Sequence, residues 1–421
     1  MFKNLRSTFH AYPRDFWILV GALFIDRVGG ALIFPFLALY ITSKFNVGMT
    51  EVGAIFAIYS GGAFFGNMIG GALADKFGRK TMLIIGLIFS AAISIMMGVI
   101  NEWELFYGLA LVTGLLSEFG GPAVQAMIAD ILPLQKRTDG FGILRVVINL
   151  SAAIGPAIGG VLAGVNYLLL FITDSVISLI TAIIVLIALP ETKPALKEGQ
   201  IEETVVQSFS GYGRVLRDKI FLAFVFLSTF TAIVYMQMNS TLSVFLRDVH
   251  AVPPRNYGYL LSVNAAMVVL FQFFVTRRVK RFHPLLVMMA GNLFYAVGFG
   301  LFGFTSLYWQ FVAAMAILTI GEMVNAPVMQ TLVADIAPED MRGRYMAVFH
   351  TGWGIAAAVG PWAAGVVLDN YNPNWIWYAG GIICSVVGLG YLVLKSRIGY
   401  RFVPHAYNDP GHPRAEKEIS A

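Results

Sequence analysis

The sequence contains little charge and almost no cysteine. Only 13% of its 421 residues are charged, which is about half the roughly 25% found in a soluble domain. An ordinary soluble globule is all but excluded, because few residues are left to solvate its exterior. The 57% share of hydrophobic residues also excludes a disordered chain. Cys384 stands alone, so no internal disulfide forms and cysteine gives no information on the compartment.

Several motifs of catalytic and nucleotide chemistry are missing as well. The chain has no G-x-x-x-x-G-K-S/T loop, so ATP-driven transport has no support. It has no H-E-x-x-H motif and no Cys/His cluster, so nothing indicates a metal site. No constellation of nucleophile and base suggests an enzyme. We therefore expect no catalytic residue, no metal site and no cofactor.

Long apolar runs are what the chain does contain. A membrane-spanning helix needs about 20 mostly apolar residues, and twelve such runs follow one another. A β-barrel is excluded, because its strands would be short and alternating. We predict an all-α integral membrane protein with spans at 16–42, 51–74, 81–100, 105–131, 140–164, 167–189, 220–246, 257–276, 284–304, 307–335, 344–368 and 375–395.

Basic residues are concentrated on alternate loops. With the N-terminus inside, the outer loops hold only Lys44, Arg247 and Arg255 of the 29 lysines and arginines. This is a strong positive-inside pattern, and it predicts that both termini are cytoplasmic. The compact loops favour a prokaryotic inner (plasma) membrane, with the lipid bilayer as partner. Because topology explains the basic clusters, we expect no nucleic-acid partner.

A long polar stretch divides the spans into two sets of six. We predict an N-terminal six-helix bundle at 1–189, a cytoplasmic linker at 190–219, a C-terminal six-helix bundle at 220–400 and a cytoplasmic tail at 401–421. The linker is either a solvated segment or a helix lying on the membrane surface. These boundaries give the chain a symmetric plan.

The two halves are related by an internal repeat. Pro122, Gln125 and Asp130 recur at one constant spacing as Pro327, Gln330 and Asp335, so spans 4–5 are repeated as spans 10–11. Parallel six-helix repeats with a site between them are an architecture of secondary transporters. The repeat therefore predicts a transporter with two pseudo-symmetric halves.

The loop after span 2, Gly71–Lys80, resembles the signature loop G-x-L-A-D-R/K-x-G-R-R/K of the major facilitator superfamily (MFS). Gly78 allows a tight turn, and Asp75 can accept from Arg79 or face the positive end of a helix. The resemblance covers roughly residues 10–400. It implies the MFS fold with alternating access, and a loop that latches the halves together in one state. Further candidate latch residues are Asp130, Asp335, Arg137 and Arg342.

Span 5 resembles the G-P-x-x-G-G motif of proton-coupled antiporters of the superfamily, through Gly155, Pro156, Gly159 and Gly160. The glycines permit close helix approach and the proline bends the helix, so ordinary packing remains the alternative reading. The first span is similar to that of the multidrug-exporter branch. Many of these exporters carry an arginine in span 4 that this chain lacks, so their coupling residues do not transfer.

Charged side chains inside spans are expensive, at about 2.5–3.5 kcal/mol each. We predict that Asp26, Glu118 and Glu322 carry proton coupling, because a carboxyl group can gain a proton in one conformation and lose it in another. Static pairing with Arg27 or Arg145 is the alternative. Asp174 lies near the start of span 6, so we expect it at the membrane interface.

Aromatic and polar residues within the spans suit a cavity for amphipathic ligands, which need apolar surface and few fixed hydrogen bonds. For each aromatic residue taken singly, lipid contact or packing is the alternative. The candidate charge partners and substrate-binding residues are Arg27, Arg145, Asn149, Tyr235, Gln237, Asn239, Asn264, His350, Trp353, Phe34, Tyr40 and Tyr59.

These observations predict a monomeric secondary transporter that exports amphipathic small molecules in exchange for protons, driven by the proton gradient. The first alternative is a lipid or glycolipid flippase of the same superfamily. The second is a proton symporter for peptides or sugars, which the span 5 motif disfavours. A membrane receptor or scaffold that does not transport would have no need to bear the cost of intramembrane acids.

Overall fold

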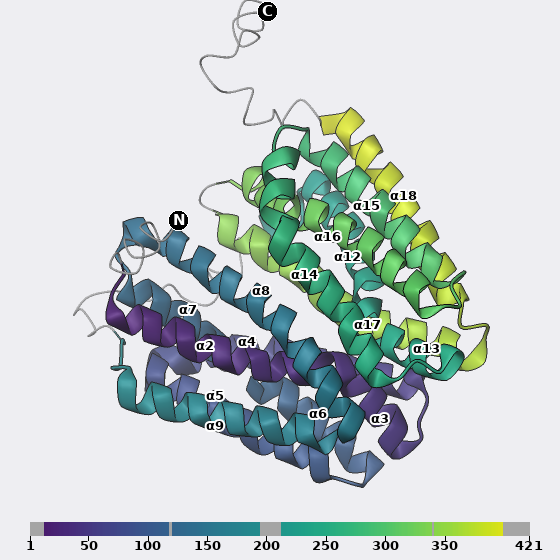
Figure 1. Cartoon of the computed structure of the whole chain (residues 1–421). Coiled ribbons are helices and arrows are strands. Elements are labelled where there is room, and N and C mark those ends of the chain that lie inside the picture. The colour runs from purple at the N-terminus through teal and green to yellow at the C-terminus, as the bar shows by residue number, and fades with distance from the viewer. Residues whose placement is uncertain (1–11, 118–119, 194–211, 339–340, 399–421) are drawn as a thin grey trace, which may run out of the picture. The chain divides into compact units, whose positions relative to one another are not determined.

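The computed structural model describes residues 12–117, 120–193, 212–338 and 341–398, and most of these residues lie in helices (Figure 1). No strand occurs among these residues. The prediction of an all-α fold is confirmed.

The first half of the chain contains a broken first span. Pro35 lies within a 3-10 turn, η1, and has no backbone N–H to continue the α-helical pattern. The predicted fourth span is divided between two helices, with residues 118–119 outside the described part. The elements are α2 (Arg14–Ile33), η1 (Phe34–Phe36), α3 (Leu37–Phe45), α4 (Met49–Phe77), α5 (Arg79–Val99), α6 (Trp103–Ser117), α7 (Gly120–Ile131), α8 (Leu134–Val165) and α9 (Leu168–Ala188).

The second half repeats this plan. A 3-10 turn, η2, interrupts its first span as η1 interrupts the first span of the chain. A single helical turn, α11, lies in the predicted linker, and residues 194–211 are outside the described part. The elements are α11 (Tyr212–Val215), α12 (Lys219–Met236), η2 (Gln237–Asn239), α13 (Thr241–His250), α14 (Pro254–Val279), α15 (Pro284–Phe302), α16 (Tyr308–Ile336), α17 (Arg342–Asn370) and α18 (Trp375–Ile398).

Ten helical segments of the described residues are long and apolar enough to cross a membrane. They correspond to ten of the twelve predicted spans. The other two predicted spans are occupied by α4, which has 29 residues, and by α6 with α7. Large apolar side chains such as Ile187 and Phe273 are exposed on the outer faces of these helices. Such faces suit lipid, and the chain is a multi-pass membrane protein.

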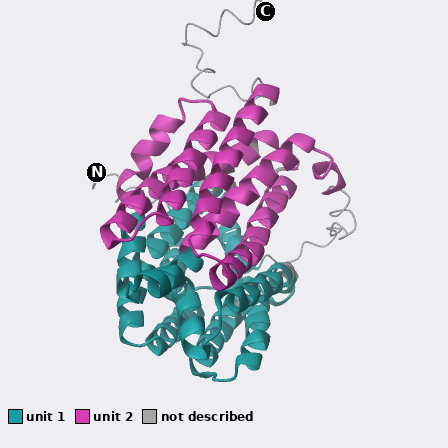
Figure 2. Cartoon of the chain, turned by 90° about the vertical axis from the view of Figure 1, so that its right-hand side faces the viewer, with its two compact units in different colours: residues 1–200, 239–265 teal, residues 201–238, 266–421 magenta. Residues whose placement is uncertain are grey.

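The chain forms two compact units (Figure 2). Unit 1 comprises residues 1–200 and 239–265, and unit 2 comprises residues 201–238 and 266–421. The segment 239–265 therefore packs with unit 1. Within that unit, Arg247 Nη1 donates to Ser43 Oγ at 2.6 Å, and the Tyr257 ring packs edge-on against Phe36. The bundle boundaries expected from the sequence stay a prediction.

The repeated glycines pack the repeated helices. A Cβ atom at Gly155 on α8 would collide with Ala31 on α2. At the equivalent position on α17, a Cβ atom at Gly360 would lie 3.2 Å from the Ile233 carbonyl oxygen on α12. In each half, the glycine thus lets this helix approach the first helix of its own half closely.

Candidate functional site

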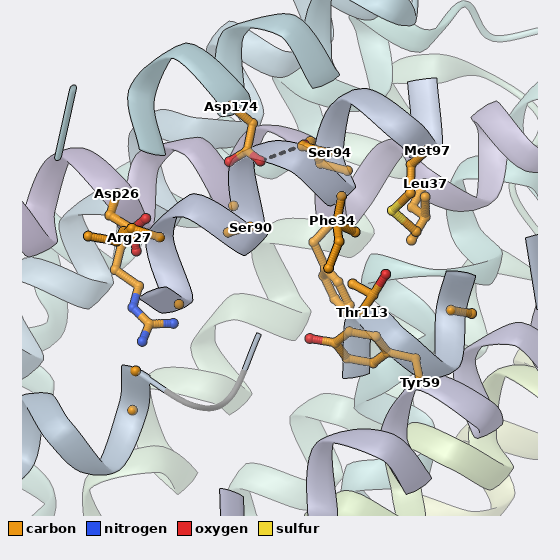
Figure 3. Close-up of a pocket in the computed structure, with 18 of the residues that line it drawn as sticks. Asp26, Arg27, Phe34, Leu37, Tyr59, Ser90, Ser94, Met97, Thr113 and Asp174 are labelled. Atoms are coloured by element: carbon orange, nitrogen blue, oxygen red, sulfur yellow. Dashed lines mark hydrogen bonds between the residues drawn. The ribbon is translucent and has the colours of Figure 1, made fainter. Parts of the chain in front are cut away.

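A cavity of about 250 Å³ lies inside unit 1 (Figure 3). Its lining comes from α2, η1 and α3 together with α4, α5, α6, α7 and α9. Most of the lining is apolar or aromatic, and Phe34, Tyr59 and Met97 are among these residues. The charged residues of the lining are Asp26, Arg27 and Asp174. The cavity therefore combines apolar walls with a small charged region, which is the arrangement typical of small-molecule sites.

Asp174 is the charged residue that α9 contributes to the cavity. Its side chain is buried, with the residue 6% exposed, and its Oδ2 accepts from Ser94 Oγ on α5 at 2.6 Å. A Cβ atom at Gly29 on α2 would come within 2.5 Å of Asp174 Oδ1. The missing side chain at Gly29 therefore makes room for this carboxyl group. Asp174 is held between α5 and α2.

The structure buries the Asp174 side chain inside unit 1, whereas its expected place at the membrane interface stays a prediction. The residue is near the start of α9, but the buried face of that helix runs through Phe171, Asp174, Ser178 and Thr181. This spacing follows the helical repeat, so Asp174 points into the bundle. Its face on the helix, rather than its place along the helix, decided its surroundings.

Asp26 on α2 shares the region with Asp174. The two carboxyl groups are close enough to interact electrostatically, and Ser178 lies beside Asp26. Figure 3 shows Asp26 and Arg27 on the left, Asp174 bonded to Ser94 at the top, and the rings of Phe34 and Tyr59 below Ser94. Two ionised carboxylates in apolar surroundings repel each other. A proton, Arg27 or a cationic ligand would relieve that repulsion, so occupancy and protonation of the pair are coupled.

A second acidic group lies in unit 2. Tyr235 on α12 donates its hydroxyl hydrogen bond to Glu322 Oε1 on α16 at 2.9 Å. The Tyr235 ring packs against Trp353 and against Tyr295, in each case with 6.0 Å between ring centroids. The structure therefore brings together three predicted residues, Glu322, Tyr235 and Trp353. The sequence reasoning missed Tyr295, which carries no signal beyond being one aromatic residue among many.

Other predicted residues lie elsewhere. Arg145 and Asn149 are exposed on α8, and neither lines the unit 1 cavity. His350 is exposed on α17. Among the described side chains, neither Arg27 nor Arg145 forms an ion pair with a carboxylate. Arg27 nevertheless lies close enough to Asp26 for charge attraction, so static pairing of this arginine stays an alternative.

The remaining polar candidates for substrate binding either donate hydrogen bonds to backbone carbonyl groups or are half-buried. Tyr40 is buried and donates to the Met97 carbonyl oxygen. Gln237 Nε2 donates to the Ile233 carbonyl oxygen at 2.7 Å. Asn239 in η2 and Asn264 in α14 are half-buried. Glu118 lies outside the described residues.

The predicted latch loop forms a cluster within unit 1. Gly78 joins α4 to α5 with φ of 104°, a conformation that only glycine adopts readily. Arg79 Nε lies 3.3 Å from Asp130 Oδ2 at the end of α7. The structure thus places Gly78, Arg79 and Asp130 side by side. The side chain of Asp75 is outside the described part.

Glu191, just beyond α9, completes this cluster and was missed in the sequence. Its Oε1 accepts from the backbone N–H groups of Arg79 at 2.8 Å and Lys80 at 3.3 Å, at the start of α5. It also accepts from the N–H groups of Thr192 and Lys193. Helix α5 follows a glycine, which offers no capping side chain, so an acceptor from elsewhere was required. The sequence shows that the start of α5 requires an acceptor, but it does not show that Glu191 supplies it.

Four backbone hydrogen bonds set the charge state of Glu191. Partial burial, the largest single influence, raises its pKa, but the N–H groups of Lys193, Lys80, Arg79 and Thr192 together outweigh it. The pKa of Glu191 therefore lies below its ordinary value of 4.5. The carboxylate is ionised at neutral pH and complements the positive end of α5.

The other latch candidates are less informative. Arg137 Nε on α8 donates to the Leu132 carbonyl oxygen at 3.2 Å, so it satisfies a carbonyl group just beyond the end of α7. Asp335 is exposed at the end of α16. The side chain of Arg342 is outside the described part. The equivalent cluster in the second half is therefore not reproduced in the described residues.

These features define a helical membrane protein of transporter type, with an internal repeat and a charged cavity in one bundle. The sequence profile of the Major Facilitator Superfamily matches residues 19–253 and again residues 226–418. The chain belongs to this superfamily of membrane transporters. The repeat of the match agrees with the repeat seen in the sequence.

Similar proteins include named antiporters. The chain is 28% identical over 418 residues to a Na(+), Li(+), K(+)/H(+) antiporter of Planococcus maritimus, which covers 93% of this chain and 95% of that protein. It is 25% identical over 392 residues to the multidrug resistance protein MdtH of Shigella flexneri, with 91% of each chain covered. The predicted resemblance to the drug:proton antiporter branch is confirmed.

A solved structure has the same fold. The crystal structure of the nucleoside transporter NupG matches with a TM-score of 0.77 over 90% of this chain and 99% of that chain. Its sequence identity is 14%, so the likeness concerns the fold alone. The MFS fold predicted from the loop and the repeat is confirmed.

Proposed function

We propose that this protein is a proton-coupled antiporter that exports amphipathic small molecules by alternating access across a prokaryotic inner membrane. The observation that carries the proposal is the presence of Asp26 and Asp174 together in the lining of a largely apolar cavity. The names of the similar antiporter and multidrug resistance protein support the same class. Both termini are cytoplasmic in this proposal, as the basic residues indicate.

The carboxyl pair gives exchange a physical basis. A lipophilic cation that enters between Phe34 and Tyr59 can place its charge beside Asp26 and Asp174 only if these groups are ionised. A proton at either carboxyl group removes that attraction. Proton and cationic substrate therefore compete for the same two side chains, and binding of one favours release of the other.

Ser94 is suited to both charge states of Asp174. Its hydroxyl donates to the ionised carboxylate at 2.6 Å, and it can rotate to accept from the protonated acid. The Asp174 side chain therefore keeps a hydrogen-bond partner when it changes protonation. Loss of a proton then does not leave a buried polar group unsatisfied.

The test uses purified protein in liposomes with an imposed pH gradient and an internal pH dye. We expect lipophilic cations to cause proton movement in the wild type, and at least tenfold less in Asp26→Asn or Asp174→Asn. Asp139→Asn is the matched control, because Asp139 is exposed on α8 and does not line the cavity. Unchanged proton movement in both cavity variants would refute the proposal. Movement of a fluorescent lipid without protons would favour the flippase.

Monovalent-cation exchange is a second candidate. The Planococcus maritimus relative is named as a Na(+), Li(+), K(+)/H(+) antiporter. Carboxylate and hydroxyl oxygens are the ligands of hard cations, and Asp26, Asp174 and Ser94 offer such oxygens. The same liposomes should then move protons on addition of Na⁺, Li⁺ or K⁺ without any drug. Comparing Glu322→Gln with the two cavity variants in this assay shows whether the acid in unit 1 or the acid in unit 2 carries the cation-driven proton movement.

A further inference from the structure

A groove of about 630 Å³ lies between α12 and α18, both within unit 2. Helix α18, which is yellow in Figure 1, contributes part of its lining. Every lining residue belongs to one of these two helices, so the groove shares no residue with the carboxylate cavity of unit 1. The lining residues are Lys219, Leu222, Ala223, Phe226, Leu227, Gly390, Val393, Leu394 and Arg397.

The sequence builds this groove from two matching stripes. On α12 the lining residues recur three or four positions apart from Lys219 to Leu227, and on α18 they do so from Gly390 to Arg397. Residues at this spacing share one face of a helix. At Gly390 a Cβ atom would come within 2.6 Å of Leu227 Cδ2, so the glycine lets the two helices meet there. Apart from Lys219 and Arg397, the lining of the groove is therefore apolar.

One end of the groove is positively charged. Lys219 is the first residue of α12, and Arg397 lies in the last turn of α18; both are exposed. No carboxylate is among the lining residues. The neighbouring Asp218 is engaged elsewhere: it accepts from the Ile220 and Phe221 N–H groups and from the Tyr345 hydroxyl. The two cations therefore face the groove without a counter-ion from its lining.

We propose that this groove binds one membrane phospholipid with an anionic headgroup. The phosphate lies between Lys219 and Arg397, and an acyl chain lies against Ala223, Phe226 and Val393. Charge and shape both favour this occupant. The walls belong to helices that are apolar enough to cross a membrane, so they meet lipid tails. Phe226 and Val393 are among the exposed large hydrophobic residues of these helices.

The charge of the groove also argues against the substrate of the proposed antiporter. Two cations at its end repel a lipophilic cation but attract a phosphate. An anionic headgroup near a membrane surface gains about 1 kcal/mol for each nearby lysine or arginine, which is about fivefold in affinity. The pair therefore predicts about a 25-fold preference for an anionic over a zwitterionic lipid of the same acyl chains.

The test is native mass spectrometry of the delipidated, full-length protein titrated with phosphatidylglycerol or phosphatidylcholine. We expect phosphatidylglycerol to bind about 25-fold more tightly in the wild type. Lys219→Gln/Arg397→Gln should abolish most of that preference. The matched control is Arg217→Gln/Lys395→Gln, which removes the same charge from neighbouring positions outside the groove. The control should keep the preference.

A second variant tests whether an acyl chain of the lipid occupies the groove. Ala223→Trp fills the groove and should weaken binding of phosphatidylglycerol at least tenfold, whereas Leu389→Trp on the outer face of α18 should not. Equal binding of both lipids by the wild type would overturn the proposal. The proposal would also be overturned if Arg217→Gln/Lys395→Gln lost the preference for phosphatidylglycerol as fully as Lys219→Gln/Arg397→Gln. Displacement of the bound lipid by inorganic phosphate or by a lipophilic cation would overturn it as well. Thermal midpoints of all variants identify any that fail to fold.

Discussion

Glu191 should hold the start of α5 in place. In Glu191→Ala, the backbone N–H groups of Arg79 and Lys80 lose the acceptor that the structure gives them at 2.8 and 3.3 Å. Loss of a capping side chain costs about 1 kcal/mol, and loss of a negative charge at a helix N-terminus costs about 0.5 kcal/mol more. The sum of about 1.5 kcal/mol corresponds to about tenfold more frequent opening of the first turn.

Hydrogen–deuterium exchange measured by mass spectrometry is the assay. Peptides that cover the first turn of α5 should exchange about tenfold faster in Glu191→Ala than in the wild type. Peptides from α15 in unit 2 should be unchanged. Glu102→Ala is the matched control, because Glu102 is an exposed glutamate beyond the other end of α5. Equal exchange in Glu191→Ala and the wild type would refute the capping role.

The pH dependence has a defined sign. Because the pKa of Glu191 is lowered in the folded protein from its ordinary value of 4.5, its contribution to stability is present above that value. It is lost as the pH falls through the lowered pKa. After correction for intrinsic exchange rates, the wild type should lose protection at the start of α5 below about pH 4.5. Glu191→Ala should lack this acid-induced loss.

Two glycine substitutions test close contacts. Gly78→Ala should lower the thermal midpoint by the equivalent of about 1–3 kcal/mol, because φ of 104° strains alanine and the new Cβ meets the Glu191 carboxylate. Gly155→Leu should likewise lower the midpoint, because its side chain would collide with Ala31. Gly142 has no atom within 4 Å of its Cβ position, so Gly142→Ala and Gly142→Leu are the controls. A control that destabilises as much as its partner would contradict the packing argument.

The spans, the repeat and the turn at Gly78 were determined by the sequence itself. An apolar run of about 20 residues has only one stable conformation in lipid, because every backbone polar group must be paired within the helix. The glycine in the loop after span 2 marks a backbone conformation that other residues avoid. These features are local, so they can be read along the chain.

The composition of the carboxylate cavity was decided by the tertiary structure. Asp26 was selected from the sequence as a coupling residue, whereas Asp174, which shares the cavity, was not, and Arg145 lies outside the cavity. The reason is physical: lipid tails and the bundle interior are both apolar, so the hydropathy around a spanning helix does not reveal which face points inward. Only packing sets that rotation.

Contacts between distant segments were likewise beyond the sequence. The start of α5 needs an acceptor, and the chain supplies it from Glu191, more than 100 residues away. The groove beside Lys219 and Arg397 depends on two helices from opposite ends of the second half. Local patterns fix which segments are helices, whereas the pairing of helix faces depends on the close packing of many side chains at once.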